Sequence, residues 1–342
     1  MKNSLRTILK GQSAKLGVIA GLLYGIFARY VAETQIFGDA FTVMSLAFLV
    51  LVPMVLGFLT VSSAVAPSLV YRIFAPWVPA LLGTLAAAAI GWEGAICIAL
   101  GLPLILFFAS IGGIFGGLAA ARRTDVRAAI LVVPLLTGSL ERHVAVPARL
   151  TETVTRIHID APPAVVWPLV VSVDSIRPEE QHRALFTRLG FPHPISATIS
   201  GAGVGAVRRA RFEHGLVFTE TVTDWQPERR LSFTIRPNTD SIPPTTLDRH
   251  VTVGGPFFDV LTGTYELTPT KDGQGTELVL RSEHRVSTRF NLYAGWWVDR
   301  IMGSIQRNIL AVHKSRAERG SRVARLHQRV TRGAAPLESK PY

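Results

Sequence analysis

Long apolar segments fill the first 140 residues, and shorter patterned segments follow them. A helix needs about 20 residues to cross a bilayer, and four of the apolar segments are close to that length or longer. They lie at about 16–32, 41–62, 77–92 and 94–121. A further segment, 128–140, is shorter and contains Pro134, so it is either an interfacial helix or a fifth crossing. The pattern predicts an α-helical transmembrane bundle over residues 1–140.

Charged residues at the ends of these segments predict their orientation. The N-terminus, the loop around Arg72 and the loop after Arg122 carry Lys or Arg, whereas the loops at 33–39 and around Glu93 carry none. Because cytoplasmic loops are enriched in Lys and Arg, we expect a multi-pass protein of the cell membrane with a cytoplasmic N-terminus. If 128–140 does not cross, the domain after it is cytoplasmic, which we favour because a basic tail suits the anionic cytoplasmic leaflet. If it crosses, that domain lies outside.

Glycines recur at every fourth position in two of the apolar segments. Gly17, Gly21 and Gly25 fall in one register, and Gly112 and Gly116 repeat the spacing. A helix face lined by glycine lets another helix approach closely. We therefore expect these faces to pack against other membrane helices, either of partner proteins or of a second copy in a homo-oligomer.

From residue 151 onward the apolar positions are spaced as in strands and amphipathic helices. Strands are predicted at 151–160, 205–212, 216–225, 231–236, 247–253, 260–268 and 277–286. One short helix opens at Pro162 and Pro163, a second spans 178–189, and a long helix runs over 290–319. An antiparallel sheet with helices on one face is an α+β layer pair. A twisted sheet that grips one long helix leaves a cavity suited to a small hydrophobic ligand.

Charge and cysteine content narrow the choice of partners. The net charge is +12, and basic residues continue into the tail, 320–342, which is predicted to extend the helix and then to be disordered. Charge next to membrane helices suits an anionic membrane surface, and no nucleic-acid-binding motif accompanies it. We expect membrane lipids and no nucleic acid as partners. Cys97 is the single cysteine, and no spacing of His and carboxylates suits a metal, so no metal and no cofactor are expected.

A resemblance to a known family rests on the start of the second half. The stretch from Ile157 to Trp167, which reads Ile-His-Ile-Asp-Ala-Pro-Pro-Ala-Val-Val-Trp, resembles the opening of the START-like superfamily, also called SRPBCC or polyketide cyclase/dehydrase. The turn at 203–205 and the segment 221–227 are similar to the middle hairpins of that family. The resemblance covers 151–319 and implies a helix-grip fold with a hydrophobic cavity. Because the family includes lipid carriers, receptors and cyclases, it implies no single activity.

Three strand residues on one predicted face are candidates for ligand binding. Glu220 alternates with Phe218 and Val222, so the three side chains share a face. If that face lines the cavity, Glu220 is a buried carboxylate that could act as an acid or a base. Otherwise the face is exposed to solvent, or an arginine forms an ion pair with Glu220. Arg208 is a candidate for binding an anionic head group, or else a solvated strand residue.

Other candidates lie on a later strand and on the helices. Asp248 and His250 share a strand face and either transfer protons or form a structural pair at the rim. Trp167 on the first helix and Tyr293 and Trp297 on the long helix either belong to the core or line the cavity.

Three functions fit these patterns. The first, which we favour, is a membrane-anchored module that binds a lipid or another hydrophobic small molecule. The second is a cyclase- or hydratase-like enzyme that uses Glu220 or His250 for proton transfer. The third is a membrane assembly or regulatory protein without a ligand.

Overall fold

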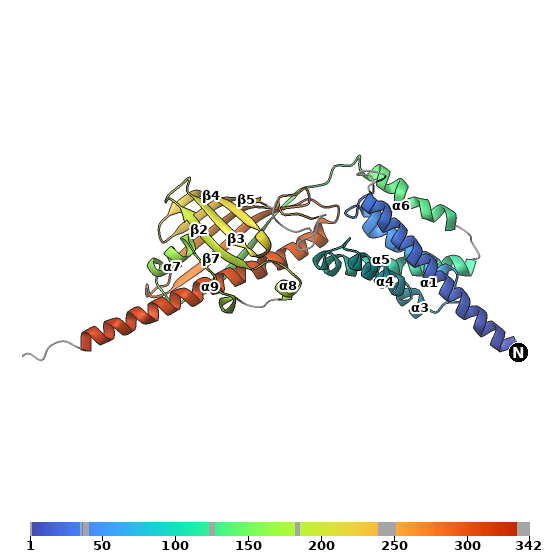
Figure 1. Cartoon of the computed structure of the whole chain (residues 1–342), viewed down its shortest axis with the longest axis horizontal. Coiled ribbons are helices and arrows are strands. Elements are labelled where there is room, and N and C mark those ends of the chain that lie inside the picture. Colours follow the sequence, from blue (N-terminus) through green and yellow to red (C-terminus); the bar gives the residue numbers. More distant parts are fainter. Residues whose placement is uncertain are drawn as a thin grey trace, which may run out of the picture. The chain divides into compact units, whose positions relative to one another are not determined.

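The computed structural model describes residues 2–34, 36, 41–122, 127–181, 185–238 and 251–333 of the 342-residue chain. Contacts within the chain define two compact units (Figure 1). The helical unit is built chiefly from residues 1–147, and the α+β unit is built chiefly from 148–243, 252–286 and 292–342.

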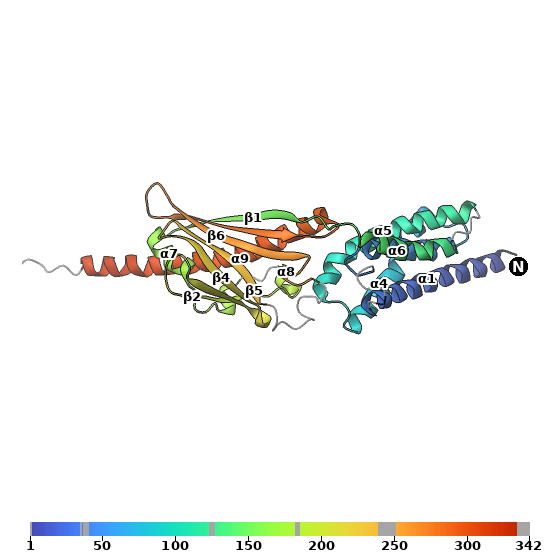
Figure 2. The ribbon, with the colours of Figure 1, turned by 90° about the horizontal axis from the view of Figure 1, so that it is seen from above.

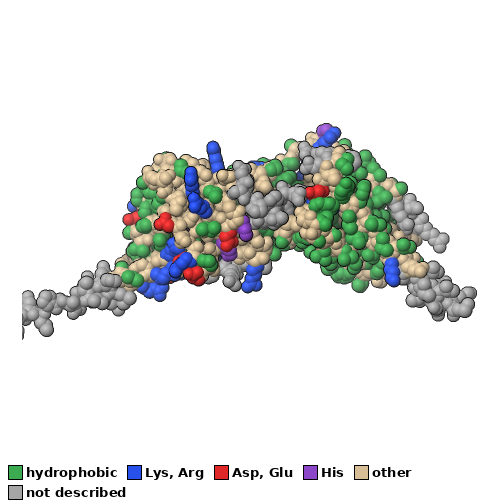
Figure 3. Space-filling view, in the orientation of Figure 1, with side chains coloured by type: hydrophobic (Ala, Val, Ile, Leu, Met, Phe, Trp, Pro, Cys, Tyr) green, Lys and Arg blue, Asp and Glu red, His purple; other side chains and the backbone are tan. Residues whose placement is uncertain are grey.

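The helical unit contains three stretches that are long and apolar enough to cross a membrane. Its elements are α1 (Lys2–Thr34), η2 (Ala47–Leu51), α2 (Val52–Ser62), α3 (Leu69–Phe74), α4 (Trp77–Ala89), α5 (Ala95–Arg122) and α6 (Arg127–Glu141). The three stretches are Gln12–Thr34, Leu69–Ala89 and Ala95–Arg122, whereas Ala47–Ser62 and Ala128–Glu141 are shorter. Figure 3 shows hydrophobic side chains over most of the visible surface of this unit, and Leu23, Phe27 and Leu85 are each more than 60% exposed.

The second apolar segment begins later than the predicted residue 41. Residues 41–45 form turns, and the helix starts at about Ala47. The reason lies in its capping: Ser45 Oγ accepts a hydrogen bond from the Phe48 N–H at 3.1 Å, and the Glu141 carboxylate accepts from the N–H groups of Leu46 at 2.8 Å and Ala47 at 3.1 Å. These side chains satisfy the first donors of the helix. Three of the four predicted crossings therefore correspond to stretches of membrane-spanning length, and the second corresponds to the shorter helix Ala47–Ser62. The segment predicted at 128–140 is the other shorter helix, and the topology stays a prediction.

A buried charge cluster holds the end of α1. Arg29 is 6% exposed and donates hydrogen bonds to Glu33 at 2.8 Å, to Glu93 at 2.8 Å and to the carbonyl oxygen of Trp92 at 2.7 Å. Because both carboxylates and the carbonyl oxygen surround the guanidinium, its charge is compensated within an apolar segment. The cluster ties α1 to the turn between α4 and α5.

The repeated glycines are used for packing within the chain. A Cβ atom added at Gly17 would lie 2.2 Å from the carbonyl oxygen of Thr60, and one added at Gly112 would lie 1.9 Å from that of Met54. Gly21, Gly25 and Gly116 also face α2. A Cβ atom added at each of them would lie 2.4, 2.9 and 2.5 Å, respectively, from the nearest atom of α2. A partner helix would have to displace α2 to use these faces. The partner proteins or homo-oligomer expected at these glycines stay a prediction.

The contact between α2 and α5 predicts the effect of a single methyl group. Gly112→Ala should lower the midpoint of thermal unfolding of the detergent-solubilised protein, because a Cβ atom cannot fit and overpacking costs about 1–3 kcal/mol. Gly101→Ala, in the same helix, is the control, because its Cβ would meet only Ile105 Cδ1 at 4.0 Å. Since alanine favours a helix by roughly 0.5–1 kcal/mol, the control should be neutral or stabilising. Equal midpoints for the two variants would refute the close packing.

The α+β unit is a seven-stranded antiparallel sheet wrapped around a long helix (Figures 1 and 2). Its helices are α7 (Pro163–Val171), η3 (Pro178–Glu180), α8 (Leu185–Arg188), η4 (Glu213–Gly215) and α9 (Asn291–Gly333). Its strands are β1 (Arg149–Ile159), β2 (Pro194–Ser200), β3 (Val207–Phe212), β4 (Val217–Gln226), β5 (Arg230–Asn238), β6 (Phe258–Pro269) and β7 (Thr276–Val286). The order is β1-β7-β6-β5-β4-β3-β2, so β1 and β2 form the two edges.

The predicted fold class is confirmed, with local corrections. The strand β2 was not predicted, because its sequence, Pro-Ile-Ser-Ala-Thr-Ile-Ser, is mostly small and polar. The predicted helix over 178–189 is replaced by the short η3 and α8. The helix α9 continues to Gly333, so it includes the helical extension expected beyond residue 319. Most of the strand predicted over 247–253 lies outside the described residues.

The core of this unit fills the space between the sheet and α9. Its buried side chains come from β1, α7, the four strands β4–β7 and α9, including Ile159, Val166, Leu231, Leu278 and Leu310. The sheet bends around α9 (Figure 2). Buried residues therefore lie on more than one side of this helix.

Candidate functional site

An ion pair lies in the interior of the α+β unit. Arg208 on β3 and Glu220 on β4 are directly opposite in the antiparallel register, and Glu220 shares its face of the sheet with the core residue Val222. They are 4% and 5% exposed, and Arg208 Nη1 donates a hydrogen bond to Glu220 Oε2. Arg208 also donates to the carbonyl oxygens of Val171 at 3.2 Å and Val170 at 3.4 Å, at the end of α7. The pair therefore joins two strands to α7.

Aromatic rings enclose this ion pair. The Arg208 guanidinium carbon lies 5.4 Å from the ring centre of Phe233 and 6.0 Å from that of Tyr265. Burial raises the pKa of the Tyr265 hydroxyl, so the phenol is neutral at pH 7. Burial also raises the pKa of the Glu220 carboxyl, and the Arg208 charge opposes that shift. Because a neutral Glu220 would leave the guanidinium unpaired, we assign the ionised pair to the folded state.

His313 of α9 completes the polar cluster. It is 2% exposed, its ring centre lies 5.8 Å from that of Tyr265, and neither ring nitrogen has a hydrogen-bond partner among the described residues. Burial, and then the charges of Arg208 and Arg316, lower the pKa of His313 to about 3. The imidazole is therefore neutral at pH 7 and keeps one donor and one acceptor.

A separate pocket of about 390 Å³ lies at the seam between β1 and α9. Its lining consists of Thr155, Arg156, Ile157, Ser304, Arg307, Asn308, Leu310 and Ala311. The volume falls in the range of about 300–1,000 Å³ that is typical of small-molecule sites. Its lining combines apolar side chains with a few polar groups and two arginines. Such a lining suits a ligand that has both an apolar part and a polar or charged part.

Hydrogen bonds of Gln306 fix the two walls of this seam pocket. Its side chain donates to the Thr153 carbonyl oxygen at 3.1 Å and to Ser282 Oγ at 2.8 Å, and it accepts from Thr155 Oγ1 at 2.7 Å. Gln306 is 1% exposed, so these bonds are shielded from water. The spacing between β1 and α9 is therefore set before a ligand binds.

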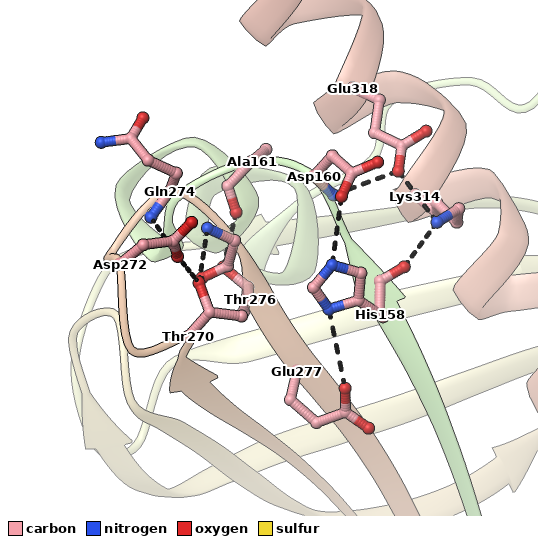
Figure 4. A network of polar contacts seen from close by, with 11 residues as sticks. His158, Asp160, Ala161, Thr270, Asp272, Gln274, Thr276, Glu277, Lys314 and Glu318 are labelled. Atoms are coloured by element: carbon pink, nitrogen blue, oxygen red, sulfur yellow. Dashed lines mark hydrogen bonds and ion pairs between the residues drawn. The ribbon is translucent and has the colours of Figure 1, made fainter.

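The far end of β1 carries an exposed polar network, shown in Figure 4. His158 contacts the carboxylate of Asp160 at 3.1 Å and that of Glu277 at 3.9 Å, and its carbonyl oxygen accepts from Lys314 at 2.6 Å. Lys314 in turn pairs with Glu318 at 2.9 Å. This network attaches α9 to the end of β1. In the described part of the chain, no group of three His, Cys, Asp or Glu side chains is placed to bind a metal.

The structure brings together some of the predicted site residues. Glu220, Val222 and Arg208 meet in the interior, and Phe218 stacks edge-on with Phe212 at 5.3 Å on the same strand pair. The prediction that an arginine pairs with Glu220 was one of the alternatives left open by the sequence. Asp248 and His250 lie outside the described residues.

The predicted aromatic residues occupy two different places. Trp167 of α7 packs against Trp225 at 5.4 Å, next to the core. Tyr293 and Trp297 contact each other at 6.3 Å near the start of α9, where Trp297 also meets Phe186 at 6.4 Å. Their role in ligand binding stays a prediction.

Sequence reasoning missed Tyr265, His313 and the seam pocket. Tyr265 alternates with Leu267 along β6, which is a signal for the inward face. His313 follows Val312 near the end of the long helix and precedes the basic residues Lys314 and Arg316, so the sequence indicates an exposed side chain there. No sequence signal marks the seam pocket, because its residues come from both ends of the unit.

The second half of the chain is similar to known proteins. Residues 148–311 match the family model described as polyketide cyclase / dehydrase and lipid transport. Similar solved structures include an uncharacterised protein from Rhizobium leguminosarum, with 15% identity over 52% of this chain and 99% of the other and a TM-score of 0.32. The Zhui aromatase/cyclase from Streptomyces sp. R1128 has 20% identity over 52% and 98%, with a TM-score of 0.31. No curated protein matches the sequence.

Proposed function

We propose that the chain, whose residues 148–311 form a domain of the polyketide cyclase/dehydrase and lipid-transport type, is a membrane-anchored protein that binds a hydrophobic small molecule or lipid. The observation that carries the proposal is the seam pocket between β1 and α9. Its apolar wall of Ile157, Leu310 and Ala311 excludes water from part of a ligand, and its polar residues orient the remainder.

Anchoring to a membrane supports a hydrophobic ligand. Three helices are long and apolar enough to cross a bilayer, and exposed apolar side chains cover the helical unit. A binding domain held next to a bilayer meets lipid-soluble molecules at a high effective concentration. The proposed multi-pass anchor, with its N-terminus and α+β unit on the cytoplasmic side, would place the domain at the anionic leaflet.

An enzymatic role in proton transfer is less well supported by the described residues. A general acid or base works best with a pKa near the operating pH. His313, with a pKa of about 3, remains neutral at pH 7, and Glu220 is engaged by Arg208. These groups stabilise and position the interior rather than carry a mobile proton.

The proposal predicts that a hydrophobic molecule co-purifies with the protein and leaves when the seam pocket is filled. Native mass spectrometry of the full-length protein released from detergent, followed by solvent extraction, should show one bound molecule per chain. Ala311→Trp should abolish that peak, because Ala311 lines the pocket and an indole would occupy it.

Ala324→Trp is the matched control on the same helix. Ala324 is exposed and does not line the pocket, so this variant should keep the bound molecule. Thermal unfolding of both variants checks that the fold is retained. Equal occupancy in the wild type and Ala311→Trp would exclude the seam pocket as the binding site, and an empty wild-type protein that also takes up no added apolar ligand would refute the proposed function.

A further inference from the structure

We infer that the seam pocket binds the anionic head group of an amphiphile, a carboxylate or a phosphate, through Arg156 and Arg307. The inference rests on the proposed function and specifies its ligand class. It starts from two arginines that line one pocket, Arg156 from β1 and Arg307 from α9.

Neither arginine has an acidic partner in the described part of the chain. Several other arginines of this unit do: Arg316 and Arg319 pair with Glu180 at 2.7 Å, and Arg281 pairs with Glu266 at 3.2 Å. No hydrogen bond or ion pair to a described residue engages Arg156 or Arg307. Two unneutralised positive charges at the rim of one pocket produce a local potential that attracts an anion.

The pocket also contains an unused hydroxyl group. Ser304 is 8% exposed and lines the pocket, and the described residues offer its hydroxyl no hydrogen-bond partner. Because the hydroxyl makes no hydrogen bond to a described residue, it can donate to a bound ligand. An oxygen atom of a carboxylate or phosphate bound between the two arginines would accept from the Ser304 hydroxyl.

The apolar part of the lining accounts for the rest of the ligand. Ile157, Leu310 and Ala311 present hydrocarbon, and Leu310 is 1% exposed, so an alkyl chain placed against them is shielded from water. Guanidinium groups bind carboxylate and phosphate through paired N–H donors, with greater geometric specificity than an ammonium group. The pocket thus matches an anionic head with an attached hydrocarbon chain.

The test compares three ten-carbon probes that differ only in the head group: decanoate, decyl phosphate and decanol. Binding of each labelled probe to the full-length protein in amphipol is measured by equilibrium dialysis at constant ionic strength. The Ala311→Trp variant serves as the blank for partitioning into the amphipol. We expect Arg156→Gln/Arg307→Gln to weaken an anionic probe by about tenfold or more and to leave decanol unchanged.

The control is Arg209→Gln/Arg211→Gln, which removes the same charge from two exposed arginines of β3 and should change no probe. A stronger effect on decanoate indicates a free carboxylate ligand, and a stronger effect on decyl phosphate indicates a lipid head group; both support the inference. Unchanged anionic binding in Arg156→Gln/Arg307→Gln, with decanol still bound, overturns the head-group assignment alone. Absence of binding of all three probes to the wild type overturns it together with the proposed function.

Discussion

Replacing Arg208 with methionine is expected to destabilise the α+β unit by about 3–5 kcal/mol, because the Glu220 carboxylate would remain buried without its partner. The loss of stability should be largest in the elements that the Arg208–Glu220 pair connects. Hydrogen-exchange mass spectrometry of the full-length protein would report it as faster exchange in peptides from β3, β4 and the end of α7, whose carbonyl oxygens Arg208 also binds.

A double substitution separates the buried charge from the loss of packing. Arg208→Met/Glu220→Leu removes both charges and should recover much of the stability lost in Arg208→Met, since an apolar pair of similar volume is often as stable as a buried ion pair. Arg209→Met is the control, because Arg209 is exposed on the opposite face of β3. If Arg208→Met exchanged no faster than Arg209→Met, the interior ion pair would not be a stabilising element.

Substituting His313 with phenylalanine should flatten the dependence of stability on pH between about 5 and 7. The folded-state pKa of His313 is about 3, below the ordinary value of 6.5, because burial and the charges of Arg208 and Arg316 disfavour its protonation. Between these values the unfolded chain binds a proton that the folded chain does not. The free energy of unfolding therefore falls as the pH falls below 6.5, by up to about 1.4 kcal/mol per pH unit.

Thermal unfolding of the full-length protein at pH 5, 6 and 7.5 measures this effect. The wild type should lose about 2 kcal/mol more than His313→Phe between pH 7.5 and 5. Burial also lowers the pKa of His284, so some dependence on pH should persist in the variant. His214→Asn, at an exposed turn residue with a φ of 59°, should follow the wild type. Parallel curves for His313→Phe and the wild type would contradict the buried, neutral imidazole.

The pattern of the sequence predicted the architecture because that architecture depends on local periodicity. Alternation along β4 placed Glu220 and Val222 on one face, and both are buried there. Along the long helix, apolar residues recur every three or four positions, and one of them, Ile301, is buried. These features follow from how side chains project from strands and helices.

Pairing across elements was not predictable in the same way. Arg208 faces Glu220 only because the β3–β4 hairpin has one particular register, which a single sequence does not specify. His313 follows the apolar residues of the long helix and is buried because the sheet bends around α9 and covers a second side of it. The seam pocket depends on the distance between the edge strand β1 and α9. The hydrogen bonds of Gln306 fix that distance, but a glutamine in a helix sequence normally indicates a solvent-exposed position.

The most direct test of ligand binding by the α+β unit is photo-crosslinking in membranes. Full-length protein in lipid vesicles is exposed to a decanoate probe that carries a terminal diazirine, and crosslinked peptides are mapped by mass spectrometry. We predict saturable labelling of peptides around Ile157 and Leu310, which excess unlabelled decanoate prevents and Ala311→Trp abolishes. Labelling confined to the apolar helices at 12–34, 69–89 and 95–122, without saturation, would show that the probe only partitions into the bilayer and would contradict the proposed binding site.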